Sequence, residues 1–210
     1  QPGLHGWGEA TLEWHTRSVV GAIEDVAQLV IGEDPTRVEH LWQMMWRQHF
    51  WHGNGIVRST AIAGIDIALW DWAGKRQNAS VCEMLGGYRK RLPAYASTYM
   101  GDRYGGLSSK EHYADFARQC LDLGYRAFKI HGWSDGNAHE EAENVLHVAA
   151  AVGDRMTLML DPACELRTFA DALYVGRACD EAGYFWYEDP FRDGGVSAFA
   201  HQRLREKLKT

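Results

Sequence analysis

Three apolar runs in the second half of the sequence end in side chains that a hydrophobic core would not select. Lys129 and His131 close the first run, Asp161 closes the second, and Glu188 with Asp189 closes the third. Two carboxylates and an amine that converge from neighbouring strands would form a site for a hard cation, with a base beside it. Mg²⁺ suits such oxygen ligands, whereas Zn²⁺ prefers more nitrogen or sulfur. We therefore predict a Mg²⁺ site formed by carboxylates at these strand ends, where Asp161, Glu188 and Asp189 are the candidates.

The chemistry that this set fits best is the removal of a proton from the carbon next to a carboxylate. Such a proton is very weakly acidic, because its loss places a second negative charge on the same group. A bound cation would stabilise the enediolate that forms, while an uncharged Lys129 or His131 accepts the proton. We expect positive neighbours to lower the pKa of Lys129 and so to keep it neutral.

Each of these residues also has an ordinary structural interpretation. Asp161 and Asp189 both precede a proline, as turn and helix-capping residues often do. Lys129 by itself could extend its stem along apolar surface, and His131 could be a hydrogen-bonded histidine at a sheet edge. The recurrence of such residues at three successive strand ends favours the functional interpretation.

A glycine repeat predicts the elements that position these side chains. Gly124, Gly153 and Gly183 each lie directly before an apolar run, and they are 29 and 30 positions apart. A further run, residues 92–100, precedes them, so we predict four parallel strands separated by segments long enough for one helix each. This α/β pattern fits a (β/α) barrel, whose working residues lie at the carboxyl ends of the strands. A doubly wound open sheet has the same period, but no GxGxxG motif follows any of these strands.

The first 91 residues predict a separate unit in which helices follow a strand. Residues 7–13 are interpreted as the end of that strand, and Thr16 as the cap of a first helix. Asp34 and Pro35 are expected to start a second helix. A third helix is predicted over residues 59–76, with small side chains that permit close approach of a neighbour at Ala61, Ala63, Gly64 and Ala68.

A glycine-containing turn joins the second and third predicted helices. It carries His52 and Asn54, and the aromatic residues Phe50 and Trp51 lie directly before it. Such a segment is either a plain connector or a lid over a site. Composition by itself favours the connector, because most glycine-rich turns have no further role.

Composition excludes several kinds of partner. The chain has 210 residues, 46% hydrophobic and 24% charged, which is sufficient for a buried core. A formal net charge of -6 without a basic block argues against nucleic acid. No stretch approaches about 18 consecutive apolar residues and no signal peptide is evident, so neither a membrane span nor export is expected. We expect free thiols in a reducing cytoplasm for the scattered cysteines Cys82, Cys120, Cys164 and Cys179.

Several motifs, in order along the chain, resemble the mandelate racemase/muconate lactonizing enzyme family of the enolase superfamily. The segment AIAGIDIALWDWAGK, residues 61–75, is similar to the helical signature of that family. Residues 6–10 resemble the last strand of its capping domain, and residues 187–190 resemble its fourth barrel strand. The resemblance implies part of an α+β capping domain over residues 1–91. It also implies the first four βα units of a modified TIM (β/α) barrel over residues 92–210.

The resemblance also implies roles for particular residues. Asp161 and Glu188 match the first and second Mg²⁺ ligands of the family, and Lys129 matches the first position of its Lys-x-Lys pair. Trp51, His52 and Asn54 match a capping-domain loop over the substrate, which shifts the expectation for this turn from connector to lid. The implied partner is a small carboxylate substrate, and a symmetric homo-oligomer is expected.

Two departures from the family pattern bear on the reaction. His131 takes the second place of the Lys-x-Lys pair, and Ala163 lies where relatives often have Asn or His. A racemase that uses two lysines on this strand is therefore not supported. We expect a hydro-lyase that dehydrates a sugar acid to a 2-keto-3-deoxy acid, with Lys129 or His131 as base or acid. The alternatives are a racemase, epimerase or cycloisomerase of the same superfamily, or a non-catalytic structural half-barrel.

The family pattern continues beyond both ends of the sequence. A third metal-binding Glu and a later His-Asp pair would follow Thr210, and the opening capping strands would precede Gln1. We therefore expect these residues to be a fragment of a longer enzyme, inactive as given.

Overall fold

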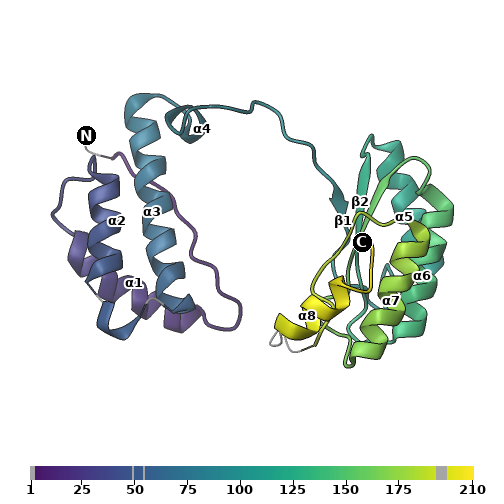
Figure 1. The fold of residues 1–210 in the computed structure, drawn as a ribbon. Coiled ribbons are helices and arrows are strands. Elements are labelled where there is room, and N and C mark those ends of the chain that lie inside the picture. Colours follow the sequence, from purple (N-terminus) through teal and green to yellow (C-terminus); the bar gives the residue numbers. More distant parts are fainter. Residues whose placement is uncertain (1–2, 49, 54, 193–197) are drawn as a thin grey trace. The chain divides into compact units, whose positions relative to one another are not determined.

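The computed structural model describes residues 3–48, 50–53, 55–192 and 198–210. The chain forms two compact units, Gln1–Arg91 (unit 1) and Leu92–Thr210 (unit 2), which are each described by themselves (Figure 1). No helix in the described part of the chain is both long and apolar enough to cross a membrane. The cysteines Cys82, Cys120, Cys164 and Cys179 are free thiols, as predicted.

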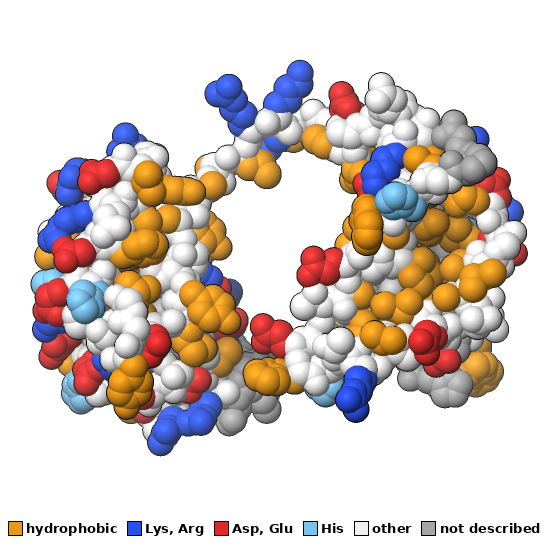
Figure 2. All heavy atoms as spheres, turned by 180° about the vertical axis from the view of Figure 1, so that it is seen from behind, with side chains coloured by type: hydrophobic (Ala, Val, Ile, Leu, Met, Phe, Trp, Pro, Cys, Tyr) orange, Lys and Arg blue, Asp and Glu red, His pale blue; other side chains and the backbone are white. Residues whose placement is uncertain are grey.

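Unit 1 consists of packed helices. Its elements are α1 (Thr16–Val30), α2 (Val38–Arg47), the 3-10 helix η1 (Phe50–His52), α3 (Ile56–Gln77) and α4 (Val81–Met84). Val26, Met45 and Ile62, one from each long helix, form the centre of its core. Hydrophobic side chains gather over one face of this unit in Figure 2.

The predicted strand at residues 7–13 is wrong. No strand is present among the described residues of unit 1, so this segment has no neighbouring strand with which to form a ladder. Instead the segment runs along α3, where the backbone N–H of Trp7 donates to the Asp71 carboxylate at 2.7 Å. A Cβ atom at Gly6 would collide with the Ala68 carbonyl, and one at Gly8 with the Gly64 carbonyl. The predicted close approach at Gly64 and Ala68 is therefore confirmed.

Two predicted helix starts are also wrong. Thr16 is the first residue of α1 rather than its cap, since the N-cap is His15 and its side chain makes no capping hydrogen bond. α2 begins at Val38, not at Asp34 and Pro35. The Asp34 carboxylate accepts hydrogen bonds from the backbone and the hydroxyl of Thr36, so it stabilises a local turn instead of a helix.

Unit 2 confirms the predicted α/β class with four successive βα units. Its elements alternate along the chain: β1 (Ala96–Ser97), α5 (Lys110–Asp122), β2 (Ala127–His131), α6 (Ala138–Val152), β3 (Thr157–Asp161), α7 (Phe169–Ala182), β4 (Trp186–Tyr187) and α8 (Ala198–Arg205). The described strands form one parallel sheet in the order β1-β2-β3-β4. Helices α5, α6 and α7 lie along one face of it (Figure 1). The first strand is much shorter than the run of residues 92–100 that predicted it.

Alternation along the strands separates a core face from a site face. Phe128 and Ile130 of β2, with Leu158 and Leu160 of β3, are buried in the core cluster that the helices complete. Because successive side chains of a strand point to opposite faces, Lys129 and its alternate neighbours point away from the helices. The sheet therefore presents the predicted site residues together on its other face.

Candidate active site

The register of the sheet brings three predicted site residues into one row. His131 of β2 pairs with Asp161 of β3, and Leu160 pairs with Tyr187, so Asp161 and Glu188 are the next positions along their strands. The backbone N–H of Glu188 donates to the Leu160 carbonyl at 2.9 Å, which extends the ladder to this point. His131, Asp161 and Glu188 thus lie side by side at the carboxyl ends of neighbouring parallel strands.

Lys129 connects the two carboxylates of this row. Its Nζ donates to Asp161 Oδ2 at 3.0 Å and to Glu188 Oε1 at 2.8 Å. Lys129 is 9% exposed and Asp161 is 7% exposed, so most of this ion cluster is out of water. Asp161 and Glu188 therefore converge on a single positive charge.

The expectation of positive neighbours around Lys129 is wrong for the described residues, whereas its neutral form beside a bound cation stays a prediction. Its neighbours are negative, not positive. Burial by itself would lower the pKa of Lys129, but hydrogen bonds and charge attraction from Glu188 and Asp161 outweigh burial and raise that pKa above its ordinary value. Without a bound cation, the two carboxylates therefore favour the ammonium form of Lys129.

His131 lies beside the ion cluster with its ring partly accessible. Its Nε2 is 3.5 Å from Asp161 Oδ2, and its side chain is 25% exposed. The ring of Tyr99 stacks on it with a centroid distance of 6.3 Å. The buried Nδ1 of His131 has no hydrogen-bond partner among the described residues. Nε2 is therefore the ring nitrogen that faces the site.

The two oxygens of the Asp161 carboxylate have different partners. Its Oδ1 accepts a hydrogen bond from the backbone N–H of Ala163 at 2.9 Å and so caps the turn that leaves β3, while its Oδ2 faces Lys129. Ala163 and Cys164 in this turn have left-handed φ angles of 56° and 61°. Asp189 contributes through its backbone carbonyl, which accepts from the N–H of Cys164 at 2.8 Å. Asp189 therefore holds the loop through its backbone carbonyl.

The donor set fits a hard divalent cation. Asp161 and Glu188 supply carboxylate oxygens from adjacent strands, and the ammonium group between them shows that the pair holds positive charge. Mg²⁺ is commonly bound through one or two carboxylates, with water and substrate oxygens completing its shell. Within the described ranges, no group of three or more His, Cys, Asp or Glu side chains forms a potential metal site. The described residues therefore offer two carboxylates, Asp161 and Glu188, as candidate ligands.

The three predicted lid residues belong to unit 1. Trp51 is 79% exposed in the 3-10 helix η1, which also contains His52. Asn54 lies outside the described residues. The assignment of Trp51, His52 and Asn54 to substrate binding stays a prediction.

Sequence reasoning missed two residues that hold the backbone of His131. Thr98, which is 5% exposed, accepts a hydrogen bond from the His131 N–H at 2.7 Å through its hydroxyl oxygen. The hydroxyl of Tyr113, a buried residue of α5, donates to the His131 carbonyl at 2.8 Å. A threonine beside a strand and a tyrosine on a helix are ordinary core residues, so the sequence carried no signal for either role.

Comparison with known protein families covers both units. Residues 1–86 match the model described as mandelate racemase/muconate lactonizing enzyme, N-terminal domain. Residues 112–210 match the model described as enolase C-terminal domain-like. The two matches follow the order in which the resemblance placed these parts along the chain.

Individual relatives agree with the family matches. The chain is 36% identical over 167 residues to a D-galactonate dehydratase of Verminephrobacter eiseniae (strain EF01-2), covering 76% of this chain and 42% of that protein. It is similar to the crystal structure of D-glucarate dehydratase from Agrobacterium tumefaciens complexed with magnesium. That match has a TM-score of 0.80 and 31% identity, and covers 91% of this chain and 51% of the other.

A further solved structure gives the same result. A member of the enolase superfamily from Polaromonas sp. JS666 matches with a TM-score of 0.82 and 30% identity, covering 97% of this chain and 52% of the other. The chain thus spans about half of the length of these relatives, or less. Taken together, the matched domains and relatives show that the chain belongs to the mandelate racemase/muconate lactonizing enzyme family of the enolase superfamily.

Proposed function

We propose that this chain supplies part of the active site of a Mg²⁺-dependent sugar acid dehydratase. The observation that carries the proposal is the convergence of Asp161 and Glu188, from neighbouring strand ends, on the Lys129 ammonium group at 3.0 and 2.8 Å. The dehydratase names of two relatives, which act on D-galactonate and D-glucarate, support the choice of substrate class.

The carboxylates of Asp161 and Glu188 are the proposed Mg²⁺ ligands. When bound, Mg²⁺ supplies positive charge that offsets the second negative charge of a carboxylate that loses its α-proton. Low exposure of Asp161 and Lys129 keeps water away from these charges, which strengthens the attraction of Asp161 for a cation and of the Lys129 ammonium group for a substrate carboxylate.

His131 is the proposed proton acceptor. Its Nε2 lies 3.5 Å from Asp161 Oδ2 and its side chain is 25% exposed, so the ring lies beside the carboxylates and is partly accessible. We assign Lys129 to balancing negative charge beside the reacting carbon. The imidazolium that His131 becomes is a suitable acid for the departing β-hydroxyl group, which leaves as water and gives an enol that tautomerises to the 2-keto-3-deoxy acid.

Trp51, His52 and Asn54 of unit 1 are proposed substrate-binding residues because they match a substrate loop of the family. Trp51 offers a large exposed aromatic surface, and His52 and Asn54 offer polar groups that can hydrogen-bond the hydroxyls of a sugar acid.

A substrate screen of the intact protein tests the proposal. Aldonic and aldaric acids are incubated with the protein and Mg²⁺, and 2-keto-3-deoxy products are measured. We expect at least one acid to be dehydrated, and chelation of the metal should abolish the reaction. Absence of product across both classes of acid would contradict a dehydratase. Exchange of the α-proton for deuterium without loss of water would instead support the racemase or epimerase alternative.

Asp161→Asn tests the metal ligand directly. The change removes one charge at nearly constant volume, so Mg²⁺ affinity measured by calorimetry should fall by more than about tenfold. Asp154→Asn is the matched control, because Asp154 lies three residues before β3 and its side chain is 79% exposed. Equal affinities of the two variants, or no Mg²⁺ binding by the unmodified protein, would favour the non-catalytic scaffold.

A further inference from the structure

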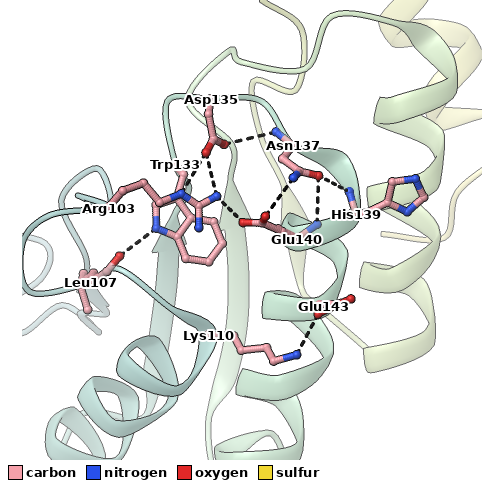
Figure 3. A network of polar contacts seen from close by, with 9 residues as sticks. All are labelled: Arg103, Leu107, Lys110, Trp133, Asp135, Asn137, His139, Glu140 and Glu143. Carbon is pink, nitrogen blue, oxygen red and sulfur yellow. Dashed lines mark hydrogen bonds and ion pairs between the residues drawn. The ribbon is translucent and has the colours of Figure 1, made fainter.

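A second cluster of charged and aromatic residues, separate from the ion pairs of Lys129, holds the segment that follows β2. Arg103, from the loop after β1, stacks its guanidinium group on the ring of Trp133 at 4.0 Å from the ring centroid. Its Nε donates to Asp135 at 2.9 Å, and it also pairs with Glu140 at the start of α6 (Figure 3). Trp133 donates from Nε1 to the Leu107 carbonyl at 2.8 Å. The loops that leave β1 and β2 are therefore joined at the same end of the sheet as the site.

Trp133 connects this cluster to the backbone of His131. Its ring packs edge-on against Tyr113 with a centroid distance of 5.1 Å and an interplanar angle of 85°. Tyr113 is fully buried, and its hydroxyl donates to the His131 carbonyl at 2.8 Å. A contact series thus runs from Arg103 through Trp133 and Tyr113 to His131.

Gly101, in the loop after β1, leaves space for the side chains of Tyr113 and Trp133. A Cβ atom at Gly101 would collide with the Tyr113 hydroxyl and would lie 2.5 Å from Trp133. The Gly101 N–H donates to the Gly132 carbonyl at 3.1 Å, one residue beyond His131. Glycine at position 101 is therefore needed for the two loops to approach this closely.

We propose that Tyr113, Trp133 and Arg103 are positioning residues that hold His131 in its catalytic place beside Asp161. The inference rests on the proposed function of His131 as proton acceptor. Tyr113 holds the His131 carbonyl, Thr98 holds its N–H at 2.7 Å, and the Arg103–Trp133 stack keeps Tyr113 in contact. Small displacements of a reacting group lower the rate of the chemical step without a matching loss of substrate affinity.

Tyr113→Phe tests the proposal, because it removes the hydroxyl and retains the ring. In the intact protein we expect kcat to fall about tenfold while KM changes less than about twofold. Tyr184→Phe is the matched control, since Tyr184 is also buried and its hydroxyl donates to the backbone carbonyl of Val145 at 3.0 Å. Arg103→Gln should give a smaller fall in kcat than Tyr113→Phe, because Trp133 and Tyr113 remain.

A second measurement separates this inference from the proposed reaction. The imidazole signal of His131 in NMR spectra is assigned by its disappearance in His131→Gln. It should shift in Tyr113→Phe and stay in place in Tyr184→Phe, even if no sugar acid proves to be a substrate. Equal kcat values and equal His131 signals in the two tyrosine variants would overturn the positioning role. A shifted signal without any dehydratase activity would support the positioning and contradict the proposed function.

Discussion

Lys129 and Glu141 are both buried charged residues of unit 2, but their surroundings differ completely. Lys129 is 9% exposed and contacts the carboxylates of Asp161 and Glu188. Glu141 of α6 is 3% exposed and lies against Gly132, where an added Cβ would collide with its carboxyl group. No described residue makes a hydrogen bond of standard geometry to either carboxyl oxygen of Glu141.

The pKa values of both residues are raised, for opposite reasons. Carboxylate partners overcome the effect of burial at Lys129 and keep it charged. At Glu141 burial dominates and raises the pKa to about 8, although Asn144, Arg103 and the backbone of Trp133 partly oppose it. Glu141 is therefore mainly protonated at neutral pH. Depth of burial does not by itself identify a functional charge, whereas the placement of opposite charges around it does.

The largest expected effect comes from replacing Lys129, because it forms ion pairs with two carboxylates. Lys129→Met leaves Asp161 and Glu188 close together without a cation, which should lower the free energy of unfolding by about 3 kcal/mol. Urea denaturation measures the loss, and Mg²⁺ should restore part of it by taking over the charge of Lys129. Lys110→Met is the control, because Lys110 is bound by Glu143 on the surface. Equal stabilities of the two variants would show that the carboxylates do not converge.

Glu141→Gln sharpens the comparison through pH. The pKa of Glu141 in the folded protein, about 8, exceeds its ordinary value of 4.5. The stability that this group contributes is therefore full below pH 4.5 and is lost as the pH rises through 8. A neutral amide does not titrate, so the variant should gain stability over the unmodified protein as the pH rises from about 5 to about 9, by more than the roughly 1.4 kcal/mol that one pKa unit represents.

Denaturation curves across that pH range measure this difference. Glu181→Gln on α7 is the matched control, because Glu181 is exposed to solvent and its replacement should leave the pH dependence of stability unchanged. Parallel stability profiles for Glu141→Gln and the unmodified protein would mean that Glu141 is ionised at neutral pH.

The smallest effect is expected at a charge pair in full contact with water. Glu143→Gln breaks the 2.8 Å ion pair with Lys110 shown in Figure 3. Water hydrates both charged groups when the ion pair is absent and so compensates for its loss. The midpoint temperature of thermal unfolding should therefore not change measurably. A clear destabilisation would mean that this surface pair is coupled to the Arg103 cluster beside it.

The strand ends of unit 2 were predictable because the residues there conflict with their surroundings. Lys129 and Asp161 each terminate an apolar run, and such a conflict is visible without coordinates. The absence of a strand at residues 7–13 was not predictable in the same way, because a strand also requires a partner. Tyr113 and Thr98 were not identified either, since their polar atoms serve a residue distant in sequence while their side chains look like ordinary core.

The sequence by itself determined the family, the alternation of strands and helices in unit 2, and the acidic and basic side chains at the strand ends. These follow from local patterns of apolar residues, glycines and charges, which are read along the chain. The tertiary structure decided that Lys129 lies between two carboxylates, that burial raises the pKa of Glu141, and that Arg103 reaches His131 through Trp133 and Tyr113. Protonation and position depend on burial and on partners from other elements, which exist only once the strands have paired and the helices have packed on them.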